Sequence, residues 1–254
     1  MTTLSALKRM KQDGTPIAVL TAYDAAFARL CGEAGCDVLL VGDSLGMVVQ
    51  GHRSTLPVTL EQMVYHTEMV ARGNTADCWL VVDIPFMADA TVEQGLASAQ
   101  ALVQAGADMV KLEGGERVLP LVERLAALGV PVCGHLGLLP QSVLRHGYRN
   151  VTPAEALLAE ARALEAAGAE MLVLECVPAE TARQIAQAVA MPVIGIGSGP
   201  HVDGQVLVLH DVLGISERAP SFSRNFMAEA GDIPAALAAY VEAVRTGEFP
   251  DEDS

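Results

Sequence analysis

The sequence predicts an α/β fold, a single (β/α)₈ TIM barrel that spans residues 1–254. Short runs rich in Val, Leu and Ile recur along the chain, and their hydrophobicity is continuous rather than alternating, as in parallel strands buried on both faces. Ala-rich amphipathic segments of helical length separate these runs. The length of 254 residues suits one barrel, and no linker or low-complexity segment divides it. A doubly wound sheet is the alternative that the strand count and the length disfavour, although the eighth strand is weakly supported. No G-x-G-x-x-G follows the first run, which further weakens a dinucleotide-binding interpretation.

The expected elements follow in chain order. After a short helical lead-in, seven strands are expected within residues 16–24, 35–43, 78–86, 106–115, 129–137, 168–178 and 191–199. An eighth strand is expected around residues 213–219, where the signal is weak. Helices are expected at 60–73, 92–106, 118–129, 153–168 and 180–190, and most of them end in a Gly that suits a left-handed C-cap. The acidic segment from about 248 to 254 is expected to be a flexible tail.

Composition argues against several classes of function. The net charge of −15 and an aromatic content of 4% argue against a nucleic-acid or anionic-membrane partner. Although 51% of the residues are hydrophobic, no apolar stretch reaches the ~18 residues that span a bilayer. The basic N-terminus lacks the apolar core of a secretion signal. Five scattered cysteines indicate reduced thiols and a cytoplasmic protein, rather than disulfides or a zinc site: Cys31, Cys36, Cys78, Cys133 and Cys176.

Polar residues stand where the expected strands end. In a barrel, the carboxyl ends of the strands converge on one mouth, where active sites are built. Lys111 and Glu113 lie two residues apart in "DMVKLEGGE", so they share the inward face of their strand. Burying such charges away from a polar mouth would be costly. The strand ends together carry Asp24, Asp43, Ser44, Asp83, Lys111, Glu113, His135, Glu175 and the glycines of "GIGSG" at 195–199.

Three of these acids indicate a magnesium site. Asp43, Asp83 and Glu113 offer carboxylates from three consecutive strands, and hard oxygen ligands on a rigid frame suit Mg²⁺. Each acid taken alone also fits a structural role, as a helix N-cap or a partner in a loop salt bridge. A cation chelated by a 2-oxo acid would stabilise an enolate, with Lys111 countering the carboxylate charge.

The remaining strand-end residues have less defined roles. Glu175 is flanked by apolar residues, and partial desolvation favours a general base; the alternative is a structural partner of Lys111. His135 either orients substrate, relays a proton or is structural. Glycines 195, 197 and 199 allow close backbone approach to a ligand, as in an anion-binding loop.

These residues also carry a family resemblance. The stretches "TAYD" (21–24), "VGDSLGMVVQGHRSTLPVTLEQMVYHT" (41–67), "DIPFM" (83–87), "MVKLEGGE" (109–116), "PVCGHLGLLPQSV" (131–143), "MLVLECVP" (171–178) and "PVIGIGSG" (192–199) resemble the ketopantoate hydroxymethyltransferase family over residues 4 to about 249. The resemblance implies a barrel of the phosphoenolpyruvate mutase/isocitrate lyase superfamily, and a homo-oligomer that is a decamer in bacterial members.

The resemblance also implies an activity and its residues. The family uses one Mg²⁺ and 5,10-methylenetetrahydrofolate to transfer a hydroxymethyl group to C3 of 3-methyl-2-oxobutanoate, which gives 2-dehydropantoate (ketopantoate) for pantothenate and coenzyme A biosynthesis. Its metal positions match Asp43, Asp83 and Glu113, and its proton acceptor matches Glu175. Its substrate contacts match Asp43, Ser44, Asp83 and Lys111, and His135 matches a histidine at its site.

Two segments depart from the family pattern. After "PQSV" the family has a longer loop of Gly-Gly-Tyr-Lys-Val-Gln-Gly type, where this chain has "LRHGYRNVTPAEA". If that loop covers the mouth, closure or folate handling would differ. The family's usual Gly-Ala-Gly is "GSG" here, with Ser198 adding a hydroxyl near the expected anion end.

Two other interpretations are weighed against the transferase. A folate-independent lyase or decarboxylase acting on another 2-oxo acid should show a cysteine in a mobile loop, whereas Cys133 and Cys176 lie in apolar runs. A non-catalytic binding protein is disfavoured because the acids and the lysine are present together.

Overall fold

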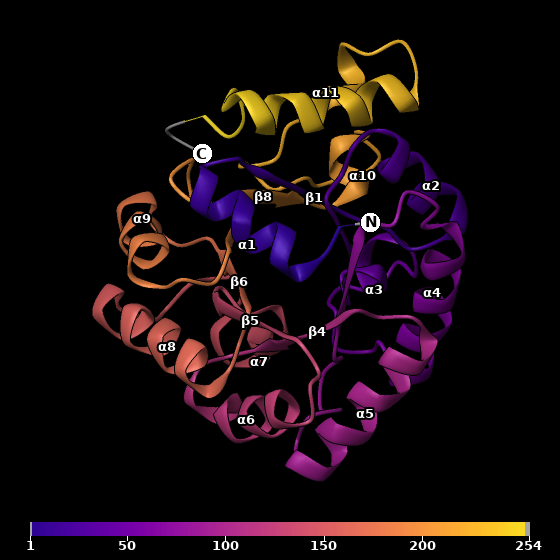
Figure 1. The fold of residues 1–254 in the computed structure, drawn as a ribbon. Coiled ribbons are helices and arrows are strands. Elements are labelled where there is room, and N and C mark those ends of the chain that lie inside the picture. Colours follow the sequence, from indigo (N-terminus) through magenta and orange to yellow (C-terminus); the bar gives the residue numbers. More distant parts are fainter. Residues whose placement is uncertain (1, 252–254) are drawn as a thin grey trace.

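Eight parallel strands form a closed barrel in the computed structural model, which describes residues 2–251 (Figure 1). Each strand pairs with its neighbours in sequence, and β8 closes the barrel against β1. This confirms the predicted fold class. The strands are β1 (Ile17–Thr21), β2 (Val38–Val41), β3 (Trp79–Asp83), β4 (Met109–Glu113), β5 (Val132–Gly137), β6 (Met171–Glu175), β7 (Val193–Ile196) and β8 (Gly204–Leu207).

The five helices expected after the strands are confirmed as α4 (Leu60–Gly73), α5 (Val92–Ala105), α6 (Leu119–Ala127), α8 (Ala154–Ala167) and α9 (Ala179–Ala188). Gly106 and Gly168 end α5 and α8 with positive φ, as the C-cap pattern predicts. Longer helices without a specific prediction are α2 (Ala25–Glu33) and α11 (Ile233–Thr246). Short helical turns are α3 (Leu45–Val48), α7 (Val143–His146), α10 (Leu209–Val212), η1 (Glu116–Val118), η2 (Pro140–Ser142) and η3 (Phe226–Ala228).

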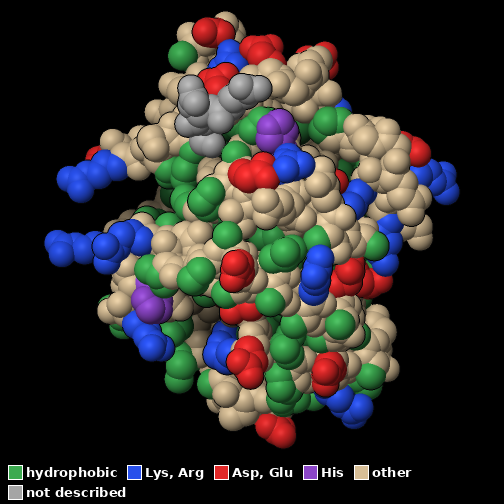
Figure 2. All heavy atoms as spheres, turned by 90° about the vertical axis from the view of Figure 1, so that its left-hand side faces the viewer, with side chains coloured by type: hydrophobic (Ala, Val, Ile, Leu, Met, Phe, Trp, Pro, Cys, Tyr) green, Lys and Arg blue, Asp and Glu red, His purple; other side chains and the backbone are tan. Residues whose placement is uncertain are grey.

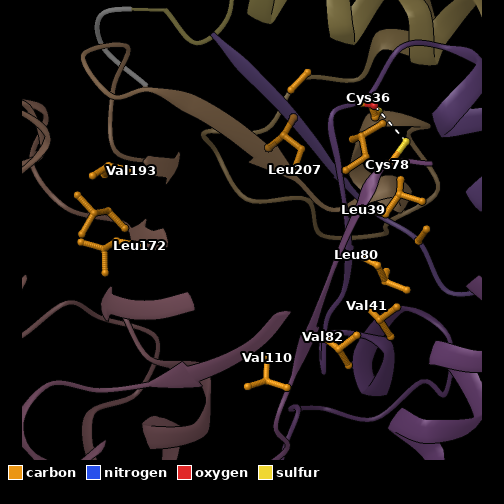
Figure 3. Packing of buried hydrophobic residues seen from close by; sticks show 14 of the residues in the cluster. Cys36, Leu39, Val41, Cys78, Leu80, Val82, Val110, Leu172, Val193 and Leu207 are labelled. Carbon is orange, nitrogen blue, oxygen red and sulfur yellow. Dashed lines mark hydrogen bonds between the residues drawn. The ribbon is translucent and has the colours of Figure 1, made fainter. Parts of the chain in front are cut away.

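Successive residues of each strand face opposite sides of the barrel wall, which is why the strands are apolar throughout. One set points inward and fills the barrel, including Val19, Val81 and Met109. The other set points outward against the helices (Figure 3), and includes Leu39, Leu80, Val110 and Leu172. In the outer layer the Cys78 thiol donates a hydrogen bond to the Cys36 carbonyl at 3.1 Å.

The predicted helical lead-in is α1 (Leu4–Asp13), which closes one end of the barrel (Figure 1). Leu7 is fully buried among the inward-facing strand residues, and Leu4 and Met10 pack beside it. Lys11 fixes the helix by donating to the carbonyls of Ala186 and Met191 and to Asp203. The opposite end of the barrel, where the strands finish, is not covered by this helix.

The eighth strand was predicted wrongly. It lies at Gly204–Leu207 and follows β7 without an intervening helix. Gly204 packs so closely that an added Cβ would lie 2.3 Å from the Ile17 carbonyl oxygen, and the buried Gln205 donates to the Gly199 carbonyl. Because a glycine and a glutamine interrupt the apolar run, the strand lacks the pattern of the others. Residues 213–219 instead form a loop at the mouth of the barrel.

The C-terminal segment is packed further than predicted. Phe249 is only 6% exposed, and its ring lies 5.7 Å from that of Phe226 and 6.0 Å from that of Tyr240. The predicted flexible tail therefore does not begin at residue 248, and its residues 252–254 lie outside the described part of the chain. Across residues 2–251, no helix combines the length and apolarity needed to cross a membrane.

Candidate functional site

A cavity of about 720 Å³ opens at the carboxyl ends of the strands. All seven residues predicted from the sequence line it, namely Asp43, Ser44, Asp83, Lys111, Glu113, His135 and Glu175. Five of them are almost completely buried, while Ser44 and Glu175 are partly exposed. The barrel therefore brings together side chains that are up to 132 positions apart, from Asp43 to Glu175, in the sequence.

Asp83 and Lys111 form a buried ion pair. They are register partners on β3 and β4, and the Lys111 Nζ lies 2.6 Å from Asp83 Oδ1. The other oxygen of Asp83 accepts a hydrogen bond from the Asp43 backbone N–H at 3.1 Å. Although burial lowers it, the carboxylates of Asp83, Glu113 and Asp43 together raise the pKa of Lys111, so the ammonium is charged at neutral pH.

His135 lies between two carboxylates. It is the register partner of Glu113 across β4 and β5, and its Nδ1 is 3.5 Å from Glu113 Oε1. Its Nε2 is 3.3 Å from Glu175 Oε2, at the end of β6. Burial and the charge of Lys111 lower the pKa of His135, but the two carboxylates outweigh them and raise it to about 9. His135 is therefore a positively charged neighbour of Glu113 and Glu175, although neither of its nitrogens has a hydrogen-bond partner in the described residues, and Lys111 pairs with Asp83 instead of Glu175.

Gln141 is a site residue that the sequence reasoning missed. It lies in η2, directly after β5, and its side-chain amide donates to Asp43 Oδ2 at 2.9 Å and to the Ile84 carbonyl at 3.0 Å. Its backbone N–H donates to Glu113 Oε2 at 3.0 Å. Gln141 thus orients two acids from different strands. The only sequence signal was its place in the segment that carries the family resemblance.

The pKa of the Asp43 carboxyl is raised by its surroundings. Burial raises its pKa, and the nearby charges of Asp83 and Glu113 raise it further against the opposing effects of Lys111 and Gln141. Its neighbour Ser44 begins α3 but makes no capping bond with its side chain. The Ser44 hydroxyl instead pairs with the Tyr23 hydroxyl at 2.8 Å, so it is held at the cavity wall.

Other strand-end residues have structural roles. Asp24 caps α2, and its carboxylate accepts from the backbone N–H groups of Ala26 and Phe27. Ser198 is 1% exposed, and its hydroxyl donates to the Leu174 carbonyl and accepts from the Val177 N–H. The glycines around it do not line the cavity. The expectation of an anion-binding loop at 195–199 is therefore not met, because that loop ties β6 to β7 instead.

A comparison with known protein families shows to which family the chain belongs. The sequence model for ketopantoate hydroxymethyltransferase matches residues 1–252. The chain belongs to the ketopantoate hydroxymethyltransferase family. It is 56% identical over 254 residues to the 3-methyl-2-oxobutanoate hydroxymethyltransferase of Halorhodospira halophila, covering 98% of this chain and 92% of that protein. It is 55% identical over 255 residues to the enzyme of the same name from Stutzerimonas stutzeri, covering 98% and 96%.

Solved structures confirm the fold of this member of the ketopantoate hydroxymethyltransferase family. The crystal structure of 2,3-dimethylmalate lyase, a PEP mutase/isocitrate lyase superfamily member, matches with a TM-score of 0.60 at 20% identity over 82% of this chain and 81% of that one. A complex of phosphonopyruvate hydrolase with oxalate and Mg²⁺ matches with a TM-score of 0.63 at 12% identity, with the same coverage. At these identities the likeness concerns the fold alone.

The donor set of the cavity fits a divalent cation. Four strand-end carboxylates of the cavity, those of Asp43, Asp83, Glu113 and Glu175, lie around Lys111 and His135. Glu113 Oε1 is buried without a hydrogen bond. Within residues 2–251, no three His, Cys, Asp or Glu side chains already surround one point. Mg²⁺ keeps several of its waters and needs only one or two protein carboxylates, so a converged trio is not required.

Proposed function

We propose that this protein transfers a hydroxymethyl group from 5,10-methylenetetrahydrofolate to C3 of 3-methyl-2-oxobutanoate, giving 2-dehydropantoate for pantothenate and coenzyme A biosynthesis. The observation that carries the proposal is that a buried, charged Lys111 and a partly exposed carboxylate, Glu175, line the same cavity. A cationic group to hold an oxo acid and a base to deprotonate it are the two requirements of an enolate reaction. The names of the relatives supply the substrate.

The inner end of the cavity would bind the 2-oxo acid. Asp43 and Asp83, with Glu113 behind them, would hold Mg²⁺, whose charge would favour the enolate form of the bound oxo acid. Lys111 would balance the negative charge of the substrate carboxylate, because Asp83 holds its ammonium group in place at the cavity wall. The Ser44 hydroxyl would donate to a substrate oxygen.

Glu175 would take the proton from C3. Its carboxylate is 18% exposed, the most accessible of the acids in the cluster around His135. His135 would hold the carboxylate in place and stabilise its charge between turnovers. The C3 carbon would form a carbon–carbon bond with the methylene carbon of the folate, and both carbon–nitrogen bonds of that methylene group would break. Water would supply the hydroxyl oxygen, and the two nitrogens of the leaving tetrahydrofolate would take up the proton removed from C3 and one proton of the water.

The partners, oligomeric state and location of the enzyme are also proposed. The small-molecule partners would be the 2-oxo acid and the folate, with no nucleic-acid or membrane partner. A homo-oligomer, a decamer by family resemblance, and a cytoplasmic location stay predictions from the sequence. Analytical ultracentrifugation of the purified protein would give the number of subunits directly.

Proton NMR in D₂O tests the chemistry in two separable stages. The purified protein is mixed with 3-methyl-2-oxobutanoate and Mg²⁺, with and without 5,10-methylenetetrahydrofolate, and an EDTA sample serves as the control. We expect C3–H exchange with metal alone and 2-dehydropantoate only when the folate is also present. Exchange without product would limit the proposal to the enolate step, and the absence of both would refute it.

A further inference from the structure

Tyr23 is a buried polar residue beside the site that the proposed chemistry does not use. Its side chain is 3% exposed and does not line the cavity. It lies between β1 and Asp24, the residue that caps α2. His66 Nδ1 of α4 donates to the Tyr23 carbonyl at 2.7 Å, and the Tyr23 ring lies 5.6 Å from that of His210 in α10. Contacts to α2, α4 and α10 therefore fix the position of the phenol.

The hydroxyl of Tyr23 meets the hydroxyl of Ser44, with 2.8 Å between the two oxygens. Ser44 lines the cavity and stands at the beginning of α3. A serine in this position usually caps the helix by accepting from a backbone N–H of the first turn. Ser44 makes no such bond. Its hydroxyl packs close to the backbone of Gly42, where an added Cβ would lie 2.9 Å from Ser44 Oγ. The Ser44 hydroxyl is therefore held by Tyr23 instead of by its own helix.

The direction of this hydrogen bond decides what Ser44 can offer a ligand. Two hydroxyls can bond in either direction. A phenol, with an ordinary pKa near 10, is a stronger acid and a better donor than the hydroxyl of a serine. Burial raises the pKa of Tyr23 against the lowering effect of the Ser44 and Thr21 hydroxyls, so the phenol keeps its hydrogen. When Tyr23 donates, the Ser44 oxygen accepts, and the serine hydrogen is left for the cavity.

Thr21 favours the same direction from the other side of the phenol. Thr21 Oγ1 accepts from the backbone N–H of Leu209 at 2.8 Å. A backbone N–H can only donate, so the hydrogen of the Thr21 hydroxyl stays available for the Tyr23 oxygen. A phenol that accepts from Thr21 is a stronger donor to Ser44, because hydrogen bonds in a buried chain polarise one another.

The bond between Tyr23 and Ser44 is neutral, in contrast to the ion pairs on the protein surface. Acidic and basic side chains are interspersed on the flank of the barrel in Figure 2, and exposed pairs such as Arg183–Glu180 contribute little to stability. Inside the cavity, Lys111 is already paired with Asp83. The Ser44 hydroxyl therefore adds a hydrogen-bond donor beside the acids without adding charge.

We propose that Tyr23 is a positioning residue for the 2-oxo acid: its phenol donates to Ser44, so that the serine hydrogen points into the cavity toward an oxygen of the bound acid. This inference rests on the proposed function, in which Ser44 donates to a substrate oxygen. It adds the residue that sets the direction of that donation. Tyr23 does not touch the substrate and acts through Ser44.

Four variants test this role. Tyr23→Phe keeps the ring and removes the phenol oxygen, Ser44→Ala removes the other partner, and a double variant removes both. Tyr240→Phe is the matched control, because Tyr240 is also fully buried and does not line the cavity. Its hydroxyl donates toward the carbonyls of Val19 and Gln205 at 2.9 and 3.0 Å.

Calorimetry in the presence of Mg²⁺ measures binding of 3-methyl-2-oxobutanoate, and proton NMR in D₂O measures its C3–H exchange. We expect Tyr23→Phe to weaken binding about two- to tenfold, as for loss of a hydrogen bond between neutral groups. The exchange rate at saturating oxo acid should fall less, because Glu175 is unchanged. Ser44→Ala should weaken binding at least as much as Tyr23→Phe. The double variant should bind no more weakly than Ser44→Ala, since the two residues act as one unit. Tyr240→Phe should bind like the wild type.

Three results would overturn the role of Tyr23 and leave the proposed function standing, when the wild type exchanges C3–H. Tyr23→Phe binds the oxo acid as tightly as the wild type, its loss and that of Ser44→Ala multiply in the double variant, or Tyr240→Phe loses as much affinity as Tyr23→Phe. Circular dichroism checks the fold of each variant. If Tyr23→Phe does not fold, wild-type affinity in Ser44→Ala would refute the proposal as well. A wild type that neither binds nor exchanges the oxo acid would refute the proposed function and the role of Tyr23 with it.

Discussion

Replacing Lys111 by Met tests the electrostatic arrangement of the site. The Lys111 and Asp83 side chains are each 5% exposed and lie 2.6 Å apart. Without the ammonium, Asp83 keeps one hydrogen bond, from the Asp43 N–H, and lies close to other carboxylates. Removing one partner of a buried pair in this way costs about 3–5 kcal/mol. This is a large share of the ~5–15 kcal/mol by which a typical domain is stable.

Urea unfolding followed by circular dichroism, without divalent cations, measures this loss. Arg29→Met is the matched control, because Arg29 pairs with Glu33 on the surface of α2, where the side chains are 48% and 55% exposed. That change should cost only about 0.3–0.5 kcal/mol. Adding Asp83→Asn to Lys111→Met should recover most of the loss, since the carboxylate that paired directly with Lys111 is then neutral. Equal losses in Lys111→Met and Arg29→Met, or no recovery in the double variant, would refute the reasoning.

Three further predictions concern other parts of the molecule. Glu175→Gln should lower the C3–H exchange rate about 10²–10⁴-fold, as expected for loss of a general base. Calorimetry should still detect binding of Mg²⁺ and the oxo acid to this variant. Loss of that binding would make Glu175 a structural residue. Gln141→Ala removes two side-chain hydrogen bonds and should cost about 1–3 kcal/mol in urea unfolding; an unchanged midpoint would show that the amide does not hold Asp43. Gly95→Ala should lower the melting temperature, because the new Cβ would lie 2.2 Å from Leu121 Cδ2. Such overpacking costs about 1–3 kcal/mol, more than the ~1 kcal/mol gained in helix propensity. A raised melting temperature would contradict this.

The barrel and most of its site could be predicted because both depend on local patterns. A parallel strand buried on both faces is apolar throughout, so a charge near its end must face the mouth, as Lys111 and Glu113 do. The same logic placed Asp83, His135 and Glu175 on the cavity wall. Their proximity follows from strand register, since charged residues at equivalent heights on neighbouring strands become neighbours in space.

The rest depends on contacts that leave no periodic signal. Gln141 acts through its backbone N–H and a neutral amide in a short helical turn, so neither charge nor spacing distinguishes it. β8 was missed because Gly204 is required by close packing against β1 and Gln205 is a buried polar residue. Asp24 lies at a strand end without joining the site, since an acid at a strand end also suits a helix N-cap. The roles assigned to the metal ligands and to Glu175 stay predictions.

The helix that closes the barrel base has a kinetic consequence. Because Leu4, Leu7 and Met10 of α1 fill that end, the cavity communicates with solvent through the opposite end. A ligand held by the inner acids then lies behind anything that occupies the outer part of the cavity. Under the proposed function, the oxo acid would therefore bind before the folate, and tetrahydrofolate would leave before the new oxo acid. Product-inhibition patterns would show this compulsory order.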